Sequence, residues 1–425
     1  MENIYWLRMM SFVGLVAMFL MAWALSENRR LVPWRIILWG IALQIGLGLI
    51  VMRSWFGQTF FSVVRQVFDL LTAASAEGSA FLFGNLTRFF LVEHAYTPGP
   101  DGLVQQEFFP INAVFAFNVL TVIIFVSGIA AILQHLGIIQ ATVRGMAWLM
   151  QRTFKTSGAE TFVTALLVFT GIESVSTIGC YLKNMTRSEL FTIMTAYLAT
   201  IAASVMVAYA GFGAEPGHLL AASVMSAPAA IAIAKLMIPE TGQPETSSGG
   251  RFEMTVESEN IFDAASRGAS LGLSMALNVG AVLIVFVGLI FLLDKGTVAL
   301  TGVPVTVLMG YLFRPFAFIM GVPWKDVAPF AELLATKTII NEFIAYQQMQ
   351  GLITEGVISK RTITIATYAL CGFANPGSLG ILIGGMSAIA PERRGDIARM
   401  SLRALVAGTL AAFTTACIAG MLIPE

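Results

Sequence analysis

The chain has 425 residues, of which 57% are hydrophobic and only 12% are charged, and its mean hydropathy is +0.79. A soluble domain typically carries about 25% charged residues, so this composition excludes the soluble globular classes and predicts a membrane protein with many spans. The formal net charge of zero offers no basic surface to nucleic acid. The three cysteines, Cys180, Cys371 and Cys417, lie in apolar runs without the spacing of a metal site or a disulfide framework.

Apolar stretches long enough to cross about 30 Å of hydrocarbon define the predicted spans. They are residues 6–25, 33–52, 112–135, 188–210, 218–238, 271–293, 362–386 and 398–421. Residues 57–75 place Arg65 and Asp69 opposite an apolar face, which predicts an amphipathic helix in the membrane interface. Residues 92–111 predict a polar loop, and residues 241–258 predict a solvent-exposed linker.

The distribution of Lys and Arg predicts the orientation of these spans. Basic residues gather in clusters near residues 29–35, 144–187, 235–267 and 393–399, whereas residues 92–111 and 211–217 carry none. Basic loops face the cytoplasm, so we expect both termini on the outer, periplasmic side.

Two further segments do not fit as simple spans. Residues 158–183 lie between two basic, cytoplasmic ends and carry Glu173 near the centre; residues 327–355 carry Glu342, and both of their ends lie outside. We interpret them as re-entrant hairpins that enter from opposite faces, and name them hairpin 1 and hairpin 2. The next spans share similar residues around Thr195 and Thr367, which favours an inverted repeat. The predicted fold class is therefore an all-α polytopic membrane protein with eight transmembrane helices, two re-entrant hairpins in an inverted repeat, and an interfacial amphipathic helix.

The two hairpin glutamates are the first candidates for function. A carboxylate near the bilayer centre costs roughly 2.5–3.5 kcal/mol or more, so Glu173 and Glu342 are expected to face a watery cavity or a ligand. The alternative is that they sit at a hairpin mouth or pair with Lys337. The sequence Asn375-Pro376-Gly377-Ser378 interrupts an apolar span and predicts a broken helix at a midplane site; the alternative is a kink supported by neighbouring helices.

Several long stretches resemble the concentrative nucleoside transporter family. They include HLLAASVMSAPAAIAIAKLMIPE at 218–240, TKTIINEFIAYQQM at 336–349, TIATYALCGFAN at 364–375 and ILIGGMSAIAPERR at 381–394. The resemblance implies a multi-pass transporter of the bacterial inner membrane that assembles as a homotrimer, with a scaffold and a moving transport domain. The domain boundaries that follow are 1–136 for the first scaffold part, 137–240 for the first half of the transport domain, 241–325 for the linker and scaffold span, and 326–425 for the second half of the transport domain.

The resemblance also assigns the residues of the site. Glu342, Asn375 and Ser378 would hold the ribose hydroxyls, and Phe373 would line the pocket. Glu173 matches the glutamate of the family's first hairpin. The preceding Gly171 and Ile172 replace a polar Gln-Thr or Gln-Ser pair, so the half of the site that faces the base is rebuilt.

The coupling cation is expected to be H⁺ or Na⁺, with no other cofactor. Thr200, Ile201 and Phe169 remain as tentative cation ligands, but Leu166 stands where sodium-binding relatives have Asn. Because an apolar hairpin disfavours a charged carboxyl group, Glu173 is the candidate for carrying a coupling proton.

Cation-coupled nucleoside uptake by an elevator-like movement is the leading functional interpretation. The partners are a nucleoside, the lipid bilayer and two further copies of the chain, and no nucleic acid. One alternative is a symporter of the same fold for another polar solute, such as a nucleobase or a modified nucleoside. Another is a nucleoside sensor that does not transport. An enzyme is disfavoured, because the sequence offers no nucleophile or metal site beside the glutamates.

Overall fold

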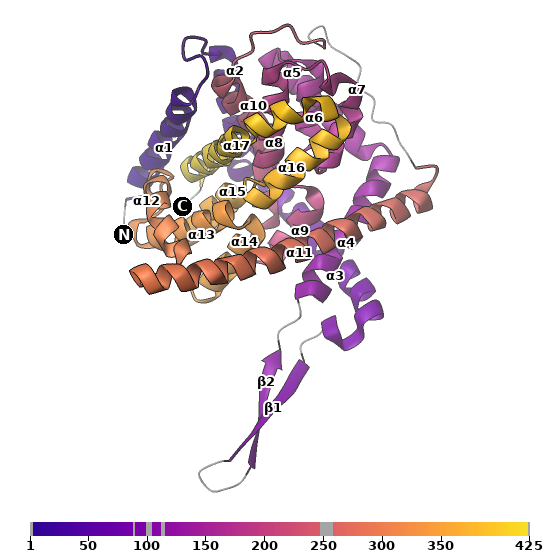
Figure 1. Cartoon of the computed structure of the whole chain (residues 1–425), viewed down its shortest axis with the longest axis vertical. Coiled ribbons are helices and arrows are strands. Elements are labelled where there is room, and N and C mark those ends of the chain that lie inside the picture. The colour runs from indigo at the N-terminus through magenta and orange to yellow at the C-terminus, as the bar shows by residue number, and fades with distance from the viewer. Residues whose placement is uncertain (1–2, 88–89, 99–103, 112–114, 247–257, 424–425) are drawn as a thin grey trace.

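The structure is a computed structural model that describes residues 3–87, 90–98, 104–111, 115–246 and 258–423. The described chain is almost entirely helical (Figure 1). By length and composition, the segments able to cross a membrane are Ile4–Ala24, Trp34–Arg53, Ala116–His135, Arg187–Gly211, Pro216–Met237, Ile261–Thr301 and Pro391–Leu422. They match seven of the eight predicted spans, and the eighth, 362–386, contains a shorter apolar helix, Pro376–Ile389. The expectation of a polytopic helical protein is confirmed, and the count of eight spans stays a prediction.

The outer part of the protein consists of helices that leave at least half of their residues partly or fully exposed. They are α1 (Ile4–Ala24), α2 (Trp34–Arg53), α3 (Trp55–Phe83), α4 (Phe115–His135), α11 (Ile261–Thr301) and α12 (Val305–Ile319), with a 3-10 turn η1 (Gly84–Thr87) after α3. The window of α11 is only 6% buried inside the protein, and this long helix crosses one side of the molecule against α4 (Figure 1). The predicted amphipathic helix at 57–75 lies within α3; its place in the membrane interface stays a prediction.

The remaining elements lie between α4 and α11 or after α12 in the chain, and they include the most buried helices. They are α5 (Ile138–Phe154), α6 (Gly158–Leu166), η2 (Ile172–Ile178), α7 (Gly179–Leu182), α8 (Arg187–Ala199), α9 (Ala203–Gly211), α10 (Pro216–Met237), η3 (Trp324–Asp326), α13 (Val327–Ile339), α14 (Glu342–Thr354), α15 (Lys360–Leu370), α16 (Pro376–Ile389), η4 (Pro391–Arg393) and α17 (Arg394–Leu422). The α8–α9 segment is 94% buried and α10 is 89% buried. A helix that is apolar on all sides is buried among other helices, and these helices form the core.

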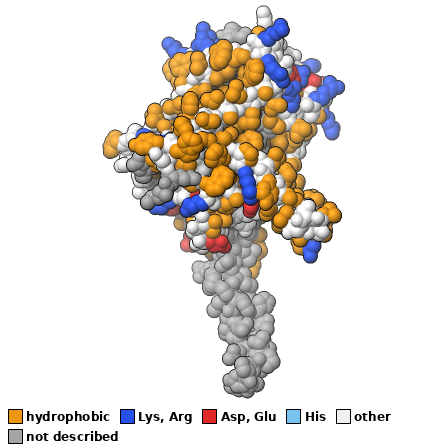
Figure 2. Space-filling model, turned by 90° about the vertical axis from the view of Figure 1, so that its left-hand side faces the viewer, with side chains coloured by type: hydrophobic (Ala, Val, Ile, Leu, Met, Phe, Trp, Pro, Cys, Tyr) orange, Lys and Arg blue, Asp and Glu red, His pale blue; other side chains and the backbone are white. Residues whose placement is uncertain are grey.

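The outer surface is apolar over a broad area. Figure 2 shows this area, with Lys and Arg side chains gathered mainly towards the end of the molecule opposite the β1 (Phe90–Pro98) and β2 (Val104–Ile111) hairpin. On α1, the large apolar side chains that are exposed include Phe12, Val16 and Leu20. Exposed apolar area of this extent fits a lipid environment, and the orientation of the spans stays a prediction.

Both predicted hairpins form as paired short segments. In hairpin 1, α6 leads to the tip near Thr170 and Gly171, and η2 with α7 leads away; in hairpin 2, α13 and α14 meet at Ile340 and Asn341. Each hairpin is followed by a broken pair of helices and then by a long helix, α10 or α17. This order, repeated twice, supports the inverted repeat, although the entry of the hairpins into a membrane from opposite sides stays a prediction.

The breaks in the two spans differ from expectation. The predicted continuous span 188–210 is interrupted between α8 and α9, where Thr200 and Ala202 have extended backbone angles. In the other span, the interruption covers the residues between Leu370 and Pro376, so it begins earlier than the expected Asn375-Pro376-Gly377-Ser378. Pro376 is therefore the first residue of α16 and does not kink a continuous helix. Proline is well tolerated there, because the backbone N–H that it lacks would have no partner within the helix at this position.

The two predicted connections, at 92–111 and at 241–258, have different outcomes. The polar loop expected at 92–111 is wrong, because this region forms the antiparallel strands β1 and β2, with Phe90 opposite Ile111. The Val, Tyr, Thr and Phe residues of these stretches favour strands, whereas our interpretation relied on the Pro and Gly residues between them. The all-α class thus holds for the body of the protein, with one projecting β-hairpin (Figure 1). Of the expected linker at 241–258, residues 247–257 lie outside the described residues.

Candidate functional site

Glu342 lies at the tip of hairpin 2, at the first position of α14. Its carboxylate is 4% exposed and accepts two hydrogen bonds: one from the Tyr209 hydroxyl to Oε1 at 2.7 Å, and one from Asn375 Nδ2 to Oε2 at 2.7 Å. The Asn341 side chain caps the same helix by accepting from the backbone N–H of Ile344 at 3.0 Å. The N-terminus of a helix also favours negative charge. The carboxylate is therefore held by the start of α14, by Tyr209 of α9 and by Asn375 at the break before α16.

Asn375 connects Glu342 to the start of α16. While its amide nitrogen donates to Glu342, its Oδ1 accepts from the backbone N–H of Ser378 at 2.8 Å. Asn375 is thus the N-cap of α16, and the cap fixes the direction of its amide. The Ser378 side chain lies in the first turn of the same half-helix and is nearly buried. The structure therefore brings Glu342, Asn375 and Ser378 together, as the resemblance implied.

The two helix breaks touch each other next to these residues. The backbone N–H of Phe373 donates to the carbonyl oxygen of Thr200 at 3.3 Å. The neighbouring Gly372 has a φ of 152°, and a Cβ at this position would lie 3.0 Å from the carbonyl oxygens of Leu198 and Ala199. Only glycine adopts such a backbone without strain, so this residue allows the two breaks to approach.

The aromatic side of the site comes from both breaks. The ring of Phe373 lies 5.7 Å from that of Tyr197 between centroids, in a tilted arrangement. Tyr197 lies on α8 and is buried. The contact between the two rings therefore joins α8 to the break between α15 and α16.

The tip of hairpin 1 is closed by its own hydrogen bonds. Glu173 Oε1 accepts from the backbone N–H of Gly171 at 2.8 Å, and the hydroxyls of Thr170 and Ser174 are hydrogen-bonded to each other. Ile172 packs against Gly385 of α16, where an added Cβ would lie 2.8 Å from Ile172 Cγ1. Gly171 and Ile172 thus contribute backbone and packing but no polar side chain.

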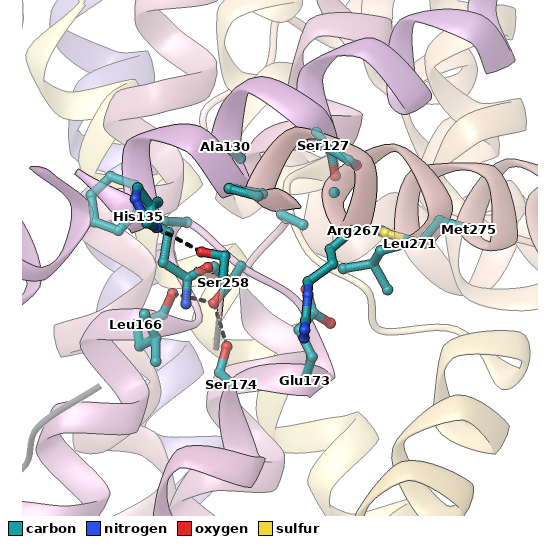
Figure 3. Close-up of a pocket in the computed structure, with 18 of the residues that line it drawn as sticks. Ser127, Ala130, His135, Leu166, Glu173, Ser174, Ser258, Arg267, Leu271 and Met275 are labelled. Carbon is teal, nitrogen blue, oxygen red and sulfur yellow. Dashed lines mark hydrogen bonds between the residues drawn. The ribbon is translucent and has the colours of Figure 1, made fainter. Parts of the chain in front are cut away.

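Glu173 itself is exposed, and it lines a pocket of about 250 Å³ between hairpin 1 and the helices α4 and α11. Figure 3 shows Arg267 of α11 reaching into this pocket beside Glu173. In the same pocket, Nδ1 of His135 lies 2.7 Å from the hydroxyl of Ser258. Glu173 therefore faces a cavity, and the expectation that its hairpin offers a purely apolar setting is wrong, because Arg267 and His135 line the same cavity.

The three tentative cation ligands lie around the break between α8 and α9. Phe169 O accepts from the backbone N–H of Ala203 at 3.2 Å, and the Thr200 hydroxyl donates to Ala196 O at 2.8 Å. The hydroxyl of Ser223, on α10, lies 3.3 Å from Val168 O and 3.4 Å from Ile201 O. Several backbone carbonyl oxygens of hairpin 1 and of the break therefore lie close together in this region. The Leu166 side chain, which is 1% exposed, adds no oxygen there.

Sequence reasoning missed several residues of this region. Tyr209, Tyr346 and Ser223 all lie in apolar runs, where one hydroxyl among many apolar residues gives no local signal. Tyr346 stacks on Tyr209 with ring centroids 4.6 Å apart. Lys337 was considered only as a partner for a glutamate, but its ammonium donates to Ala369 O at 2.7 Å.

Comparison with known families assigns almost the whole chain. The family model described as "Na+ dependent nucleoside transporter N-terminus" matches residues 13–86, the model "Nucleoside recognition" matches residues 116–216, and the model "Na+ dependent nucleoside transporter C-terminus" matches residues 218–420. The chain belongs to the concentrative nucleoside transporter family. This family consists of transporters and not of enzymes.

Individual members of the concentrative nucleoside transporter family are similar over nearly the entire chain. Solute carrier family 28 member 3 of Mus musculus is 40% identical over 98% of this chain, which spans only 59% of the length of that relative. The uncharacterized transporter YutK of Bacillus subtilis is 38% identical, over 99% of this chain and 100% of YutK.

Solved structures of CNTnw share the fold of this chain. The inward-facing, substrate-bound structure superposes with a TM-score of 0.87 at 32% identity and covers 98% of this chain and 99% of that one. A variant of CNTnw in an outward-facing state gives a TM-score of 0.88 at 31% identity, with 99% of each chain covered. The fold described above is therefore shared with the solved structures of CNTnw.

Proposed function

We propose that this protein takes up nucleosides across the bacterial inner membrane, driven by a cation gradient. The observation that carries the proposal is the hydrogen-bonded pair of Glu342 and Asn375 at the point where hairpin 2 meets the break between α15 and α16. An ionised carboxylate offers about four lone-pair sites, so Glu342 can accept from solute hydroxyl groups in addition to its two protein donors. Ribose presents neighbouring hydroxyl groups of this kind.

The nucleoside would lie between the two hairpin tips. Glu342, Asn375 and Ser378 would hold the ribose, and Phe373 would offer an aromatic surface beside it. At the other tip, Gly171, Ile172 and Glu173 would face the base, with Glu173 as its remaining polar side chain. The hydrogen bond from the Gly171 N–H to Glu173 turns the carboxylate back onto the hairpin, which supports a weaker hold on the base than on the ribose.

Two observations bear on the coupling cation. The family description names Na⁺, and Phe169, Thr200 and Ile201 supply oxygens around one break. Against sodium stands Leu166, since Na⁺ needs a shell of several oxygens and this apolar side chain removes one. We therefore propose coupling to protons, with Na⁺ as the alternative. Glu173 remains the candidate proton carrier because it is an exposed carboxyl group at the tip of hairpin 1 that lines a pocket, not because it is buried.

An elevator-like movement of the hairpins and broken helices past the outer helices would alternate the access to the site. Support comes from the similarity to CNTnw in both an inward-facing and an outward-facing state. In this proposal, residues 137–240 and 326–425 form the moving domain, while residues 1–136 and 241–325 hold the membrane and the contacts of a homotrimer. Both termini would face the periplasm.

Uptake of labelled uridine and adenosine into proteoliposomes tests the proposal. Accumulation against a gradient, saturable and blocked by excess unlabelled nucleoside, is the expected result. Binding of nucleoside without accumulation would favour a sensor. Accumulation that free nucleobases inhibit as well as nucleosides do would favour transport of another polar solute.

A further inference from the structure

Lys235, near the end of α10, is a buried charge at the base of hairpin 1. Its side chain is 2% exposed, and its Nζ lies 2.8 Å from Glu160 Oε2 and 3.1 Å from Glu240 Oε2. The Nζ also donates to the hydroxyl of Ser188, in the first turn of α8, at 3.1 Å. A buried ammonium is costly unless an opposite charge compensates it, and here two carboxylates lie within ion-pair distance.

The partners of this ammonium belong to different elements. Glu160 lies in the first turn of α6, where its Oε1 accepts from the backbone N–H of Ser157, the N-cap residue, at 2.9 Å. Glu240 Oε2 accepts from the hydroxyl of Thr186, the N-cap of α8, at 2.9 Å. The base of hairpin 1, the start of α8 and the end of α10 are thus joined in one group of side chains. We name it the Lys235 cluster; its members are Ser157, Glu160, Thr186, Ser188, Lys235 and Glu240.

The same three elements meet again at the tip of hairpin 1. From the Lys235 cluster, α6 leads to this tip and α8 leads to the break at Thr200. On α10, Ser223 lies about 18 Å from Lys235 along the helix, at 1.5 Å per residue. The Ser223 hydroxyl lies 3.3 Å from Val168 O of hairpin 1 and 3.4 Å from Ile201 O at the break. The three elements are therefore joined at both ends, by charge at the base and by a hydroxyl near the tip.

The burial of the Lys235 cluster makes its charges important. Glu160 is 1% exposed and Ser188 is 3% exposed, so water does not screen the ion pair. When one partner of a buried ion pair is removed, the other charge is left uncompensated and the fold is strongly destabilised. The neighbouring Arg187 offers a comparison, because its ion pair with Glu27 is partly exposed and Glu27 has a second partner in Arg403. Exposed ion pairs contribute little to stability.

We propose that Lys235 is a positioning residue for hairpin 1. Its ammonium fixes the base of the hairpin against α8 and α10, so that the tip keeps its place beside the break between α8 and α9. The inference rests on the proposed function only where it assigns hairpin 1 to the solute site. It assigns Lys235 no contact with the solute or with the coupling cation.

Hydrogen–deuterium exchange of the purified full chain, measured without solute, tests the anchor. In Lys235→Met, backbone exchange at residues 158–178 of hairpin 1 should become faster by about tenfold or more, because the base of the hairpin opens locally. Exchange at residues 327–355 of hairpin 2 should stay at the wild-type rate. An equal acceleration in both hairpins would mean that Lys235 only stabilises the fold as a whole. Unchanged exchange in hairpin 1 would mean that its base is held without Lys235, and either result would overturn the proposal.

A double-variant cycle tests whether the anchor acts through the ion pair. Lys235→Met leaves the Glu160 carboxylate uncompensated, whereas Lys235→Met combined with Glu160→Gln removes both charges. The acceleration of exchange in the double variant should therefore be clearly smaller than the product of the two single accelerations. Independent effects would overturn the charge-based anchor. If Lys235→Met alone does not fold, the double variant should still be recovered; its failure to fold, with Glu160→Gln folded, would also overturn the proposal.

Solute binding gives a second readout, with Arg187→Met as the matched control. The affinity of Lys235→Met for uridine, measured by calorimetry, should fall by about tenfold or more, because a displaced tip loses its hydrogen bonds to the solute. Arg187→Met removes a partly exposed charge beside the Lys235 cluster and should change neither exchange nor affinity. Faster exchange in hairpin 1 with unchanged affinity would contradict the positioning role. If the wild type does not bind uridine, the proposed function fails, while the exchange experiment still decides whether Lys235 anchors the hairpin.

Discussion

The carboxylate of Glu342 and the amide of Asn375 are 33 positions apart in the chain and 2.7 Å apart in the structure. One belongs to a hairpin tip and the other to a helix break, and neither element would hold its shape alone as a short apolar segment. The hydrogen bond therefore joins the hairpin tip to the helix break and places a carboxylate beside an amide where we propose that the solute binds.

Replacing Glu342 with Gln should nearly abolish uptake. The change keeps the shape but removes the charge, and a hydrogen bond to a charged group contributes roughly 1.5–3 kcal/mol, or about tenfold to 150-fold in affinity. Uridine uptake and binding measure the effect. Glu355→Gln, at the exposed end of the same helix, is the matched control and should behave like the wild type. Wild-type affinity in Glu342→Gln would remove this residue from the site.

Asn375→Ala and Ser378→Ala should weaken the binding of nucleosides more than that of free nucleobases. Their side chains lie next to Glu342 on the side proposed for the ribose, so a solute without ribose should not sense them. Competition of labelled uridine by uridine and by uracil distinguishes the two cases. An equal loss for both competitors would mean that these residues only shape the start of α16, where Asn375 is the N-cap.

Restoring a polar tip should change the selectivity among bases. A side chain at Gly171 would place its Cβ 2.6 Å from Glu173 Oε2, so Gly171→Gln should push the carboxylate off the hairpin and towards the solute. Combined with Ile172→Thr, it adds an amide and a hydroxyl on the side of the base. We expect tighter binding or a shifted order of competitors in a panel of nucleosides. An identical competition profile would show that the base is held elsewhere.

Uptake should persist when choline replaces sodium and should fall when a protonophore removes the pH gradient. The reason is the missing oxygen at Leu166, and Glu173→Gln should then abolish the response to pH and leave at most exchange. The complementary variant Leu166→Asn should increase the stimulation by sodium. Sodium-dependent uptake that a protonophore does not affect would contradict proton coupling and would assign the carbonyls near Phe169 and Ile201 to a complete sodium site.

Gly372→Ala should impair folding and transport together. At a φ of 152°, the new methyl group would lie 3.0 Å from two carbonyl oxygens of α8, so the breaks could no longer approach. The yield of folded protein and its melting temperature measure the effect. Gly380→Ala, in α16, has open space around the added Cβ and serves as the control; equal behaviour of the two variants would argue against close contact of the breaks.

The sequence was sufficient for the positions of the hairpins and of their glutamates, because a charge inside an apolar stretch and basic residues at both ends are local signals. It was also sufficient to associate Asn375 with a break. It was not sufficient for the place of the break in 188–210, since no proline or glycine marks Thr200, and the interruption depends on contact with the other repeat. The environment of Glu173 was missed for the same reason: Arg267 and His135 come from helices far along the chain, and only the tertiary structure places them in the pocket of hairpin 1.

The hydrogen bond from the Phe373 N–H to Thr200 O has a further consequence. Thr200 belongs to the proposed cation ligands and Phe373 to the proposed solute pocket, so one peptide contact is shared by both sites. Any ion that stabilises the break at Thr200 would also favour the backbone that presents Phe373 to the solute. Linkage is reciprocal. If the cation raises the affinity for nucleoside by some factor, nucleoside must raise the affinity for the cation by the same factor. The coupling would then pass through a backbone hydrogen bond and would not require a side chain.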